Sequence, residues 1–318
     1  MVEVLGVEVP GAEALGRATR TLVAFEIGCL ARQALQPGQR GRVGAVFARS
    51  FYASLAGTEV CVGPPGLGAG PLNLRCRSAP RDWRAAGLRE GTAVLAGPHE
   101  LHLPPHLAIS VGEATLWTPP PPGPWSPASL SAGLSALDAL LPARLPEQGL
   151  GFLALPSRAE AAARSAVAAA AREPAEALSA FLNRAMTENG DRAIPPASEF
   201  RALVGLGPGL TPSGDDLLGG ALVALHLLDR PDLAEKLWHG IGGALETGTN
   251  AISRAHLAAA ARGLGGAALH AILNDLVIGK TEVLPARLDA IDRIGHCSGW
   301  DALAGAVLAL RAASVCRL

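Results

Sequence analysis

The chain has 318 residues, 49% of them hydrophobic, and a formal net charge of −1. This composition excludes a disordered chain, and the small net charge argues against a nucleic-acid partner or binding to an acidic membrane surface. Five cysteines without a Cys-x-x-Cys spacing argue against disulfides and against a structural zinc site. No apolar run is long enough to span a bilayer, and the start of the chain lacks the basic region and apolar stretch of a signal peptide, so we expect a cytoplasmic protein.

The first part of the chain, to about residue 118, predicts a β-rich domain. Short apolar or alternating runs separated by glycine and proline clusters are typical of closely spaced strands, and they favour a small barrel or sandwich. These runs cover residues 43–47, 59–62, 72–76, 92–95 and 107–111. One early helix is expected from about Ala14 to Leu35, because apolar residues recur there at helical spacing.

A proline-rich stretch over residues 119–127 follows this β-rich part. Proline lacks the backbone donor that a helix interior or a central strand requires. We therefore predict a linker here, between a first domain of residues 1–118 and a second domain of residues 128–318.

After the linker, apolar residues recur at helical spacing almost throughout, which predicts an α-helical bundle and so an α+β protein of two domains. The candidate helices cover residues 129–141, 158–172, 175–188, 212–229, 232–247, 250–262, 267–277 and 299–312. Many helix faces carry alanine and glycine, so we expect close helix packing.

The most informative feature of the helical part is a pattern that occurs twice. Ser-Gly-Asp-Asp begins at Ser213 and Ser-Gly-Trp-Asp begins at Ser298, and a glycine follows at the matching positions Gly220 and Gly305. If the two helices cross at these glycines, both helix N-termini lie on one side of the bundle and face one pocket.

A loop rich in glycine and proline, residues 205–212, precedes the first copy. Such a loop can approach a ligand closely and has few conformations to lose on ordering. Ser213 is expected to cap the helix and Asp216 to complete a capping box. A capped helix needs no ligand to explain it, but a cap does not require three glycines upstream.

Two helix starts at one pocket would offer N–H groups and positive dipole ends to a small anion. The acids Asp215, Asp216 and Asp301 would repel a bare anion, so they act as caps, bind a divalent cation, or accept hydrogen bonds from a substrate –NH₂ group. His296, in the loop ahead of the second copy, is the candidate for acid–base chemistry because its ordinary pKa is near neutrality.

A third helix start lies between the two copies. Asn250, Ser253 and Arg254 fall within one turn and could bind a carboxylate or an amide, while capping by Thr249 is the competing account. The candidate catalytic residues are thus His296, Asp216 and Asp301. The candidate substrate-binding residues are Gly207, Gly209, Thr211, Ser213, Gly214, Asp215, Asn250, Ser253, Arg254, Ser298 and Gly299. The residues establish no cofactor; a divalent cation is one alternative.

The motifs over residues 205–216 and 295–301, with 43–47 and 70–72, resemble a bacterial family first catalogued as a domain of unknown function. That family is associated with AllH, a subunit of oxamate carbamoyltransferase in anaerobic allantoin breakdown. The resemblance implies carbamoyl transfer between carbamoyl phosphate and oxamate, with other protein subunits as partners. The chain departs from the family pattern at 44–45, where Gly-Ala stands in place of polar residues.

These observations favour an enzyme subunit that binds a small anionic substrate and transfers an acyl group, with N–H donors at the developing oxyanion. A non-catalytic assembly or regulatory subunit is the second hypothesis, because low charge and small residues suit packing against partner chains. A metal-dependent amidohydrolase that uses Asp215, Asp216 and His296 is the third.

Overall fold

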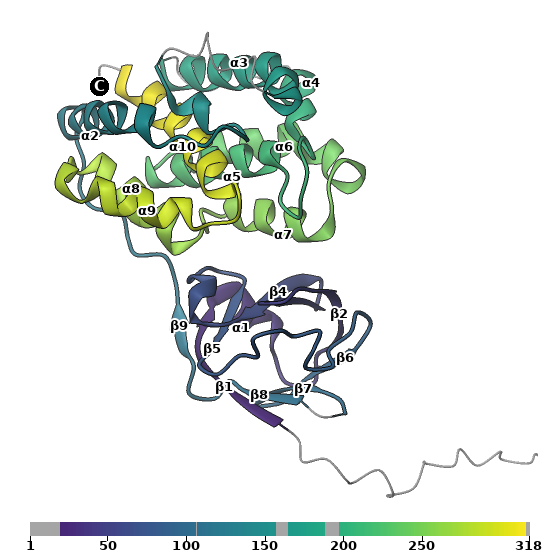
Figure 1. Cartoon of the computed structure of the whole chain (residues 1–318). Helices are drawn as coiled ribbons and strands as arrows, with labels where there is room; N and C mark the ends of the chain where they lie inside the picture. The colour runs from purple at the N-terminus through teal and green to yellow at the C-terminus, as the bar shows by residue number, and fades with distance from the viewer. Residues whose placement is uncertain (1–19, 106, 157–164, 188–196, 316–318) are drawn as a thin grey trace, which may run out of the picture.

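The computed structural model describes residues 20–105, 107–156, 165–187 and 197–315, and Figure 1 shows a β-barrel followed by a body of helices. The strands are β1 (Arg20–Gly28), β2 (Arg40–Val46), β3 (Phe51–Leu55), β4 (Thr58–Gly63), β5 (Asn73–Cys76), β6 (Ala93–Ala96), β7 (Glu100–Leu103), β8 (Leu107–Ser110) and β9 (Thr115–Trp117). The predicted α+β fold class is therefore confirmed.

Eight of the nine strands in the described ranges close into the barrel. Their order is β5-β4-β3-β2-β6-β7-β8-β1, and β1 pairs again with β5, so the sheet has no free edge at that point. The ninth strand, β9, runs parallel to the end of β1. Of the two predicted β architectures, the structure is the barrel.

Side chains alternate between the inside and the outside of the barrel, as the two-residue period of a strand requires. In β3, Phe51, Ala53 and Leu55 are buried in the barrel core, whereas Tyr52 and Ser54 are only partly buried. Inside the barrel, Phe51 packs edge to face against Trp83 with ring centroids 4.8 Å apart. The core thus fixes which side chains of β3 point outward.

The predicted early helix is wrong over residues 20–28, which form β1, while α1 is a short helix over Cys29–Ala34. Residues 14–19 lie outside the described residues. Leu22 and Ala24 are buried and Val23 between them is exposed, which is the strand period. Pairing with β5 on one side and β8 on the other decides the conformation, because the apolar spacing alone fits either period.

The helices are α2 (Pro127–Leu140), α3 (Ala166–Thr187), α4 (Ala197–Phe200), α5 (Ser213–Leu227), α6 (Pro231–Gly248), α7 (Ala251–Ala260), α8 (Ala267–Val277), α9 (Leu284–Asp292) and α10 (Ser298–Val315). Helices α5 and α10 are buried along most of their length and cross in the middle of the helical body (Figure 1). The other helices surround this pair, which forms the centre of the second core.

Two helix predictions need correction. The candidates 158–172 and 175–188 are not separated at Pro174, because α3 runs through it, and residues 157–164 and 188 lie outside the described residues. Ala171, Ala175 and Leu178 keep one face of α3 buried, and this packing outweighs the hydrogen bond that the proline removes. Helix α9 was not predicted at all.

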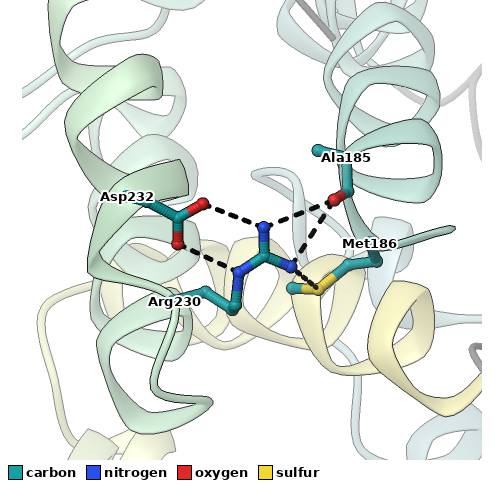
Figure 2. A network of polar contacts seen from close by, with 4 residues as sticks. All are labelled: Ala185, Met186, Arg230 and Asp232. Atoms are coloured by element: carbon teal, nitrogen blue, oxygen red, sulfur yellow. Dashed lines mark hydrogen bonds and ion pairs between the residues drawn. The ribbon is translucent and has the colours of Figure 1, made fainter. Parts of the chain in front are cut away.

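Arg230 ties the start of α6 to the end of α3, as Figure 2 shows. Its guanidinium pairs with Asp232 at 2.9 Å and lies 3.5 Å from the carbonyl oxygen of Ala185 and 3.6 Å from the sulfur of Met186. A cation at the last carbonyls of a helix also complements the helix dipole. This network belongs to the framework of the helical body.

The barrel and the helices meet at α7 and at the start of α8. Leu30 and Leu72 of the barrel form a small apolar cluster with Ala259, and the backbone N–H of Ala267 donates to the carbonyl oxygen of Ala69 at 2.9 Å. The larger cores comprise residues between 22 and 114 and between 130 and 312. The domain boundaries at 118 and 128 stay a prediction.

Across the described part of the chain, no helix combines the length and apolar character needed to cross a bilayer. The four cysteines in the same ranges are free thiols.

Candidate functional site

The two copies of the repeat meet where α5 crosses α10. A Cβ atom on Gly220 would lie 1.8 Å from the carbonyl oxygen of Ala302, and one on Gly305 would lie 1.7 Å from that of Leu217. The backbone of each helix therefore packs directly against a glycine of the other helix, and the two glycines are at matching positions of the two copies. The predicted crossing at Gly220 and Gly305 is confirmed.

The crossing brings each serine to the aspartate of the other copy. Ser213 lies by the Asp301 carboxyl and Ser298 by the Asp216 carboxyl, and each serine acts to lower the pKa of the aspartate beside it. The Thr211 hydroxyl lies 3.0 Å from the Ser298 hydroxyl. The motif thus serves to join the two helices at their N-terminal turns.

The expected capping box at α5 is wrong. The residue at the N-cap position is Pro212, which has no side-chain cap, and Ser213 is already the first helical residue. Ser213 is turned toward Asp301 instead, so its hydroxyl is used between helices rather than within one.

Asp216 and Asp301 each have one carboxylate oxygen without a hydrogen-bond partner. Within the described residues, Asp216 Oδ2 and Asp301 Oδ2 are buried and have no hydrogen-bond partner. Asp301 is only 1% exposed, and its Oδ1 accepts from the backbone N–H of Leu150 at 2.5 Å. A buried polar group without a partner costs about 1–3 kcal/mol, more if charged, so such a pair is unusual in a purely structural role.

Burial shifts the acid–base properties of both aspartates. It raises the pKa of Asp216 well above its usual range. A hydrogen bond from Ser298 lowers this pKa in part, and the charge of Asp301 raises it further. Burial raises the pKa of Asp301 to about 6, although hydrogen bonds from Ser213 and the backbone act to lower it. Near neutral pH the pair therefore carries less than two full negative charges, which reduces its repulsion of an anion.

The neighbouring thiol is a poor nucleophile. Burial raises the pKa of Cys297, and the charges of Asp301 and Asp216 act in the same direction. Because the thiolate is the reactive form of cysteine, these surroundings suppress its reactivity.

Asp215 has the opposite environment to Asp216, although the two are adjacent in sequence. Its Oδ1 accepts from the Gly205 N–H at 2.8 Å, and its Oδ2 accepts from the hydroxyls of Ser253, at 2.6 Å, and Thr249. Three donors thus surround a carboxylate that is 2% exposed. Asp215 holds the glycine-rich loop and the start of α7 in place.

The other candidates at α7 also have partners within the protein. Asn250 caps the helix, since its Oδ1 accepts from the Ser253 N–H at 3.0 Å, and its side-chain N–H donates to the Leu210 carbonyl at 2.8 Å. Arg254 donates to the carbonyl oxygens of Thr249 at 3.0 Å and Glu246 at 3.2 Å. Capping is thus confirmed at this helix start, by Asn250 rather than Thr249.

The glycines ahead of the two serines adopt backbone conformations that side chains disfavour. Gly207 and Gly209 have φ of 110° and 106°, and Gly295 has φ of 59°. Cβ positions on Gly207 and Gly295 would lie 3.3 and 3.2 Å from the hydroxyls of Ser213 and Ser298, respectively. Both copies therefore place a glycine directly against their serine.

The backbone N–H groups predicted to bind substrate at the two helix starts have acceptors within the protein. The N–H groups of Gly214 and Gly299 donate to the carbonyl oxygens of Leu206 at 2.9 Å and Ile294 at 3.1 Å. These two donors are therefore engaged within the protein. His296 lies in the exposed turn that leads into α10.

Sequence reasoning missed the segment that covers Asp301. Leu150 supplies its N–H to that carboxylate, and a Cβ on Gly149 would lie 2.6 Å from Asp301 Oδ1. The only available signal was the Gly-Leu-Gly sequence at 149–151, which by itself indicates no partner.

A metal site is not assembled by the residues proposed for one. Among the residues that the structure describes, no three His, Cys, Asp or Glu side chains converge in a way that could hold a metal ion. Asp215 is surrounded by hydrogen-bond donors, and a cation requires free acceptors instead.

The fold and the site define an α+β protein in which a β-barrel precedes a helical body with a buried aspartate pair at a duplicated helix start. Residues 203–310 match the family described as oxamate carbamoyltransferase subunit AllH. The match spans about a third of the chain and includes both copies of the repeat. No curated protein and no solved structure matches the chain.

Proposed function

We propose that this chain is a subunit of an oxamate carbamoyltransferase-like enzyme and that the crossing of α5 and α10 binds its amide-bearing, anionic substrate. The observation that carries the proposal is the pair of buried, unpartnered oxygens, Asp216 Oδ2 and Asp301 Oδ2. The family match over residues 203–310 supplies the class of reaction.

Oxamate and carbamoyl phosphate share the chemistry that this site would recognise. Each has an –NH₂ group on a carbonyl carbon and a negative charge at the other end. A carboxylate oxygen is a strong acceptor for N–H groups, so Asp216 and Asp301 would bind the –NH₂ end. The hydroxyl groups of Thr211, Ser213 and Ser298 lie around the same pair and are suited to contact the carbonyl oxygen.

The aspartates also suit the proton transfer that the reaction requires. The oxamate nitrogen forms a bond to the carbamoyl carbon, the bond from that carbon to the phosphate oxygen breaks, and phosphate leaves with the electron pair. The nitrogen loses one proton in this exchange. An ionised Asp301 with a raised pKa is a stronger base than an ordinary carboxylate and would take that proton at Oδ2. His296 is proposed to pass the proton to solvent from its exposed turn.

Thermal-shift measurements with oxamate, carbamoyl phosphate and inorganic phosphate test the binding step, because a ligand that binds only the folded chain raises its stability. We expect the two amide-bearing ligands to raise the melting temperature of the wild type, and the shift to be lost in Asp216→Asn and Asp301→Asn. Gly242→Ala is the matched control, since nothing lies within 4 Å of the added Cβ. Equal shifts in the Asn variants and the wild type would contradict the proposal.

Activity of the assembled enzyme separates a catalytic from a non-catalytic subunit. Partner subunits combined with Asp301→Asn should show a loss of carbamoyl transfer on the order of a hundredfold or more if this residue is the base. Full activity of the partners without this chain would instead favour an assembly or regulatory subunit.

A further inference from the structure

The barrel presents an outward-facing pair of polar side chains on β3 and β4. Tyr52 and Cys61 are register partners across these strands, and the residues on either side, Phe51 and Ala53, point into the barrel core. Cys61 is only 2% exposed although it faces outward, so another part of the protein covers it. Tyr52 is the only tyrosine of the chain.

The helical part of the chain meets the barrel at β4. Helix α7 packs against β4, and Ala259 of α7 lies in the same apolar cluster as Leu72, which precedes β5. At its other end, α7 holds Asp215 through the Ser253 hydroxyl at 2.6 Å. Asp216, with its unpartnered oxygen, is the next residue. A short series of contacts therefore connects β4, the partner strand of β3, with the start of α5, where Asp215 and Asp216 lie.

The electrostatics of Tyr52 agree with this placement. Burial raises the pKa of the Tyr52 phenol, its interactions with Cys61 raise it further, and the charge of Asp216 adds to the effect. The raised pKa keeps the Tyr52 hydroxyl protonated around neutral pH, so the hydroxyl is available as a hydrogen-bond donor.

We propose that Tyr52 is a substrate-binding residue that the barrel contributes to the α5–α10 site, and that its hydroxyl donates to an oxygen of the amide-bearing substrate. This inference rests on the proposed function. The thiol of Cys61 is a weak acceptor. A substrate carbonyl or carboxylate oxygen would therefore replace it as the partner of the Tyr52 hydroxyl. The barrel then takes part in binding rather than serving only as a separate module.

A single tyrosine makes the inference directly measurable. Isotope-labelled tyrosine gives one NMR resonance, from Tyr52, in the full chain. We expect this resonance to shift in Asp216→Asn without ligand, and to shift in the wild type as oxamate or carbamoyl phosphate is added. Tyr52→Phe should weaken binding of the same ligands on the order of tenfold with little change in melting temperature. Ser54→Ala, on the same outer face of β3, is the control and should bind as the wild type does.

The outcomes separate this inference from the proposed function. Ligand-induced stabilisation of the wild type with an unmoved Tyr52 resonance and normal binding by Tyr52→Phe would overturn the role of Tyr52 and leave the α5–α10 site intact. Absence of any ligand-induced stabilisation in the wild type would overturn the proposed function, and the role of Tyr52 with it.

Discussion

Gly220 of α5 and Ala302 of α10 are in contact through their backbones: the carbonyl oxygen of Ala302 occupies the place where a side chain of residue 220 would be. The carbonyl oxygen of Leu217 lies against Gly305 in the same way. The two helix starts can come together only because both positions lack a Cβ atom.

The first prediction concerns this contact. Gly220→Ala should lower the free energy of unfolding by at least about 3 kcal/mol, because its Cβ would lie 1.8 Å from backbone that cannot move independently. The Cβ added in Gly219→Ala meets only the Ala260 Cβ at 3.7 Å and the Leu257 Cδ2 at 3.9 Å, both ordinary contacts, so this variant should be neutral or stabilise by up to about 1 kcal/mol through helix propensity. Urea unfolding of both variants checks this, and a similar loss in both would refute the tight crossing.

The second prediction contrasts the adjacent acids of α5. Asp215→Asn should lower the free energy of unfolding by about 2–3 kcal/mol, since an amide cannot accept from all three donors around that position. Asp216→Asn should be neutral or stabilising, because it removes a buried acid with an unpartnered oxygen. Denaturant titrations of the two variants provide the comparison. A larger loss in Asp216→Asn would show that its carboxylate has a structural partner.

The third prediction is a pH dependence. The Asp301 pKa is raised to about 6 in the folded protein, while an aspartate in the unfolded chain has a pKa of about 4. The folded chain therefore binds more protons in this window, so the contribution to stability is full below about pH 4 and is lost as the pH rises through about 6. Its size is on the order of 3 kcal/mol.

Unfolding of the wild type and Asp301→Asn at about pH 5 and pH 7 isolates this effect. The wild type should gain stability relative to the variant at the lower pH. His256 and His270 act in the opposite direction, because burial lowers their pKa to about 4, but they are common to both proteins. Parallel pH profiles would mean that Asp301 is not perturbed.

The fourth prediction uses the network of Figure 2. Arg230→Gln should lower the free energy of unfolding by about 1 kcal/mol, because a partly exposed ion pair and a helix-end contact are each weak. Ligand-induced thermal shifts should be the same as in the wild type. Loss of those shifts would indicate that destabilisation alone abolishes binding. The aspartate variants would then not test the binding site specifically.

Much of the fold follows from local pattern. Runs such as residues 59–62 predict strands, and the long apolar periodicity around α5 and α10 predicts helices within a few residues of their ends. The strand β1 was missed because Leu22 and Phe25 fit a helix as well as a strand, and the strands that decide between them lie far along the chain. Local pattern cannot contain that information.

The sequence predicted which residues lie at the candidate site better than it predicted what each of them does there. The matched glycines indicated the crossing, but they could not indicate that each serine would reach the aspartate of the other copy. Asp215 and Asp216 look alike in sequence, and their roles differ only because successive residues of a helix point in different directions. Leu150 contributes a backbone N–H, which leaves no trace in a side-chain motif.

The exchange of partners between the copies has a consequence for the order in which the protein can mature. Ser213 and Asp216 leave the ribosome well before Ser298 and Asp301. A growing chain therefore contains the first copy of the repeat before the second copy, which holds its interaction partners, has been synthesised. Contacts between such distant positions form late, after the intervening loop has closed. The proposed binding site can therefore form only after Ser298 and Asp301 have been synthesised, and a ligand of that site cannot guide the earlier steps of folding.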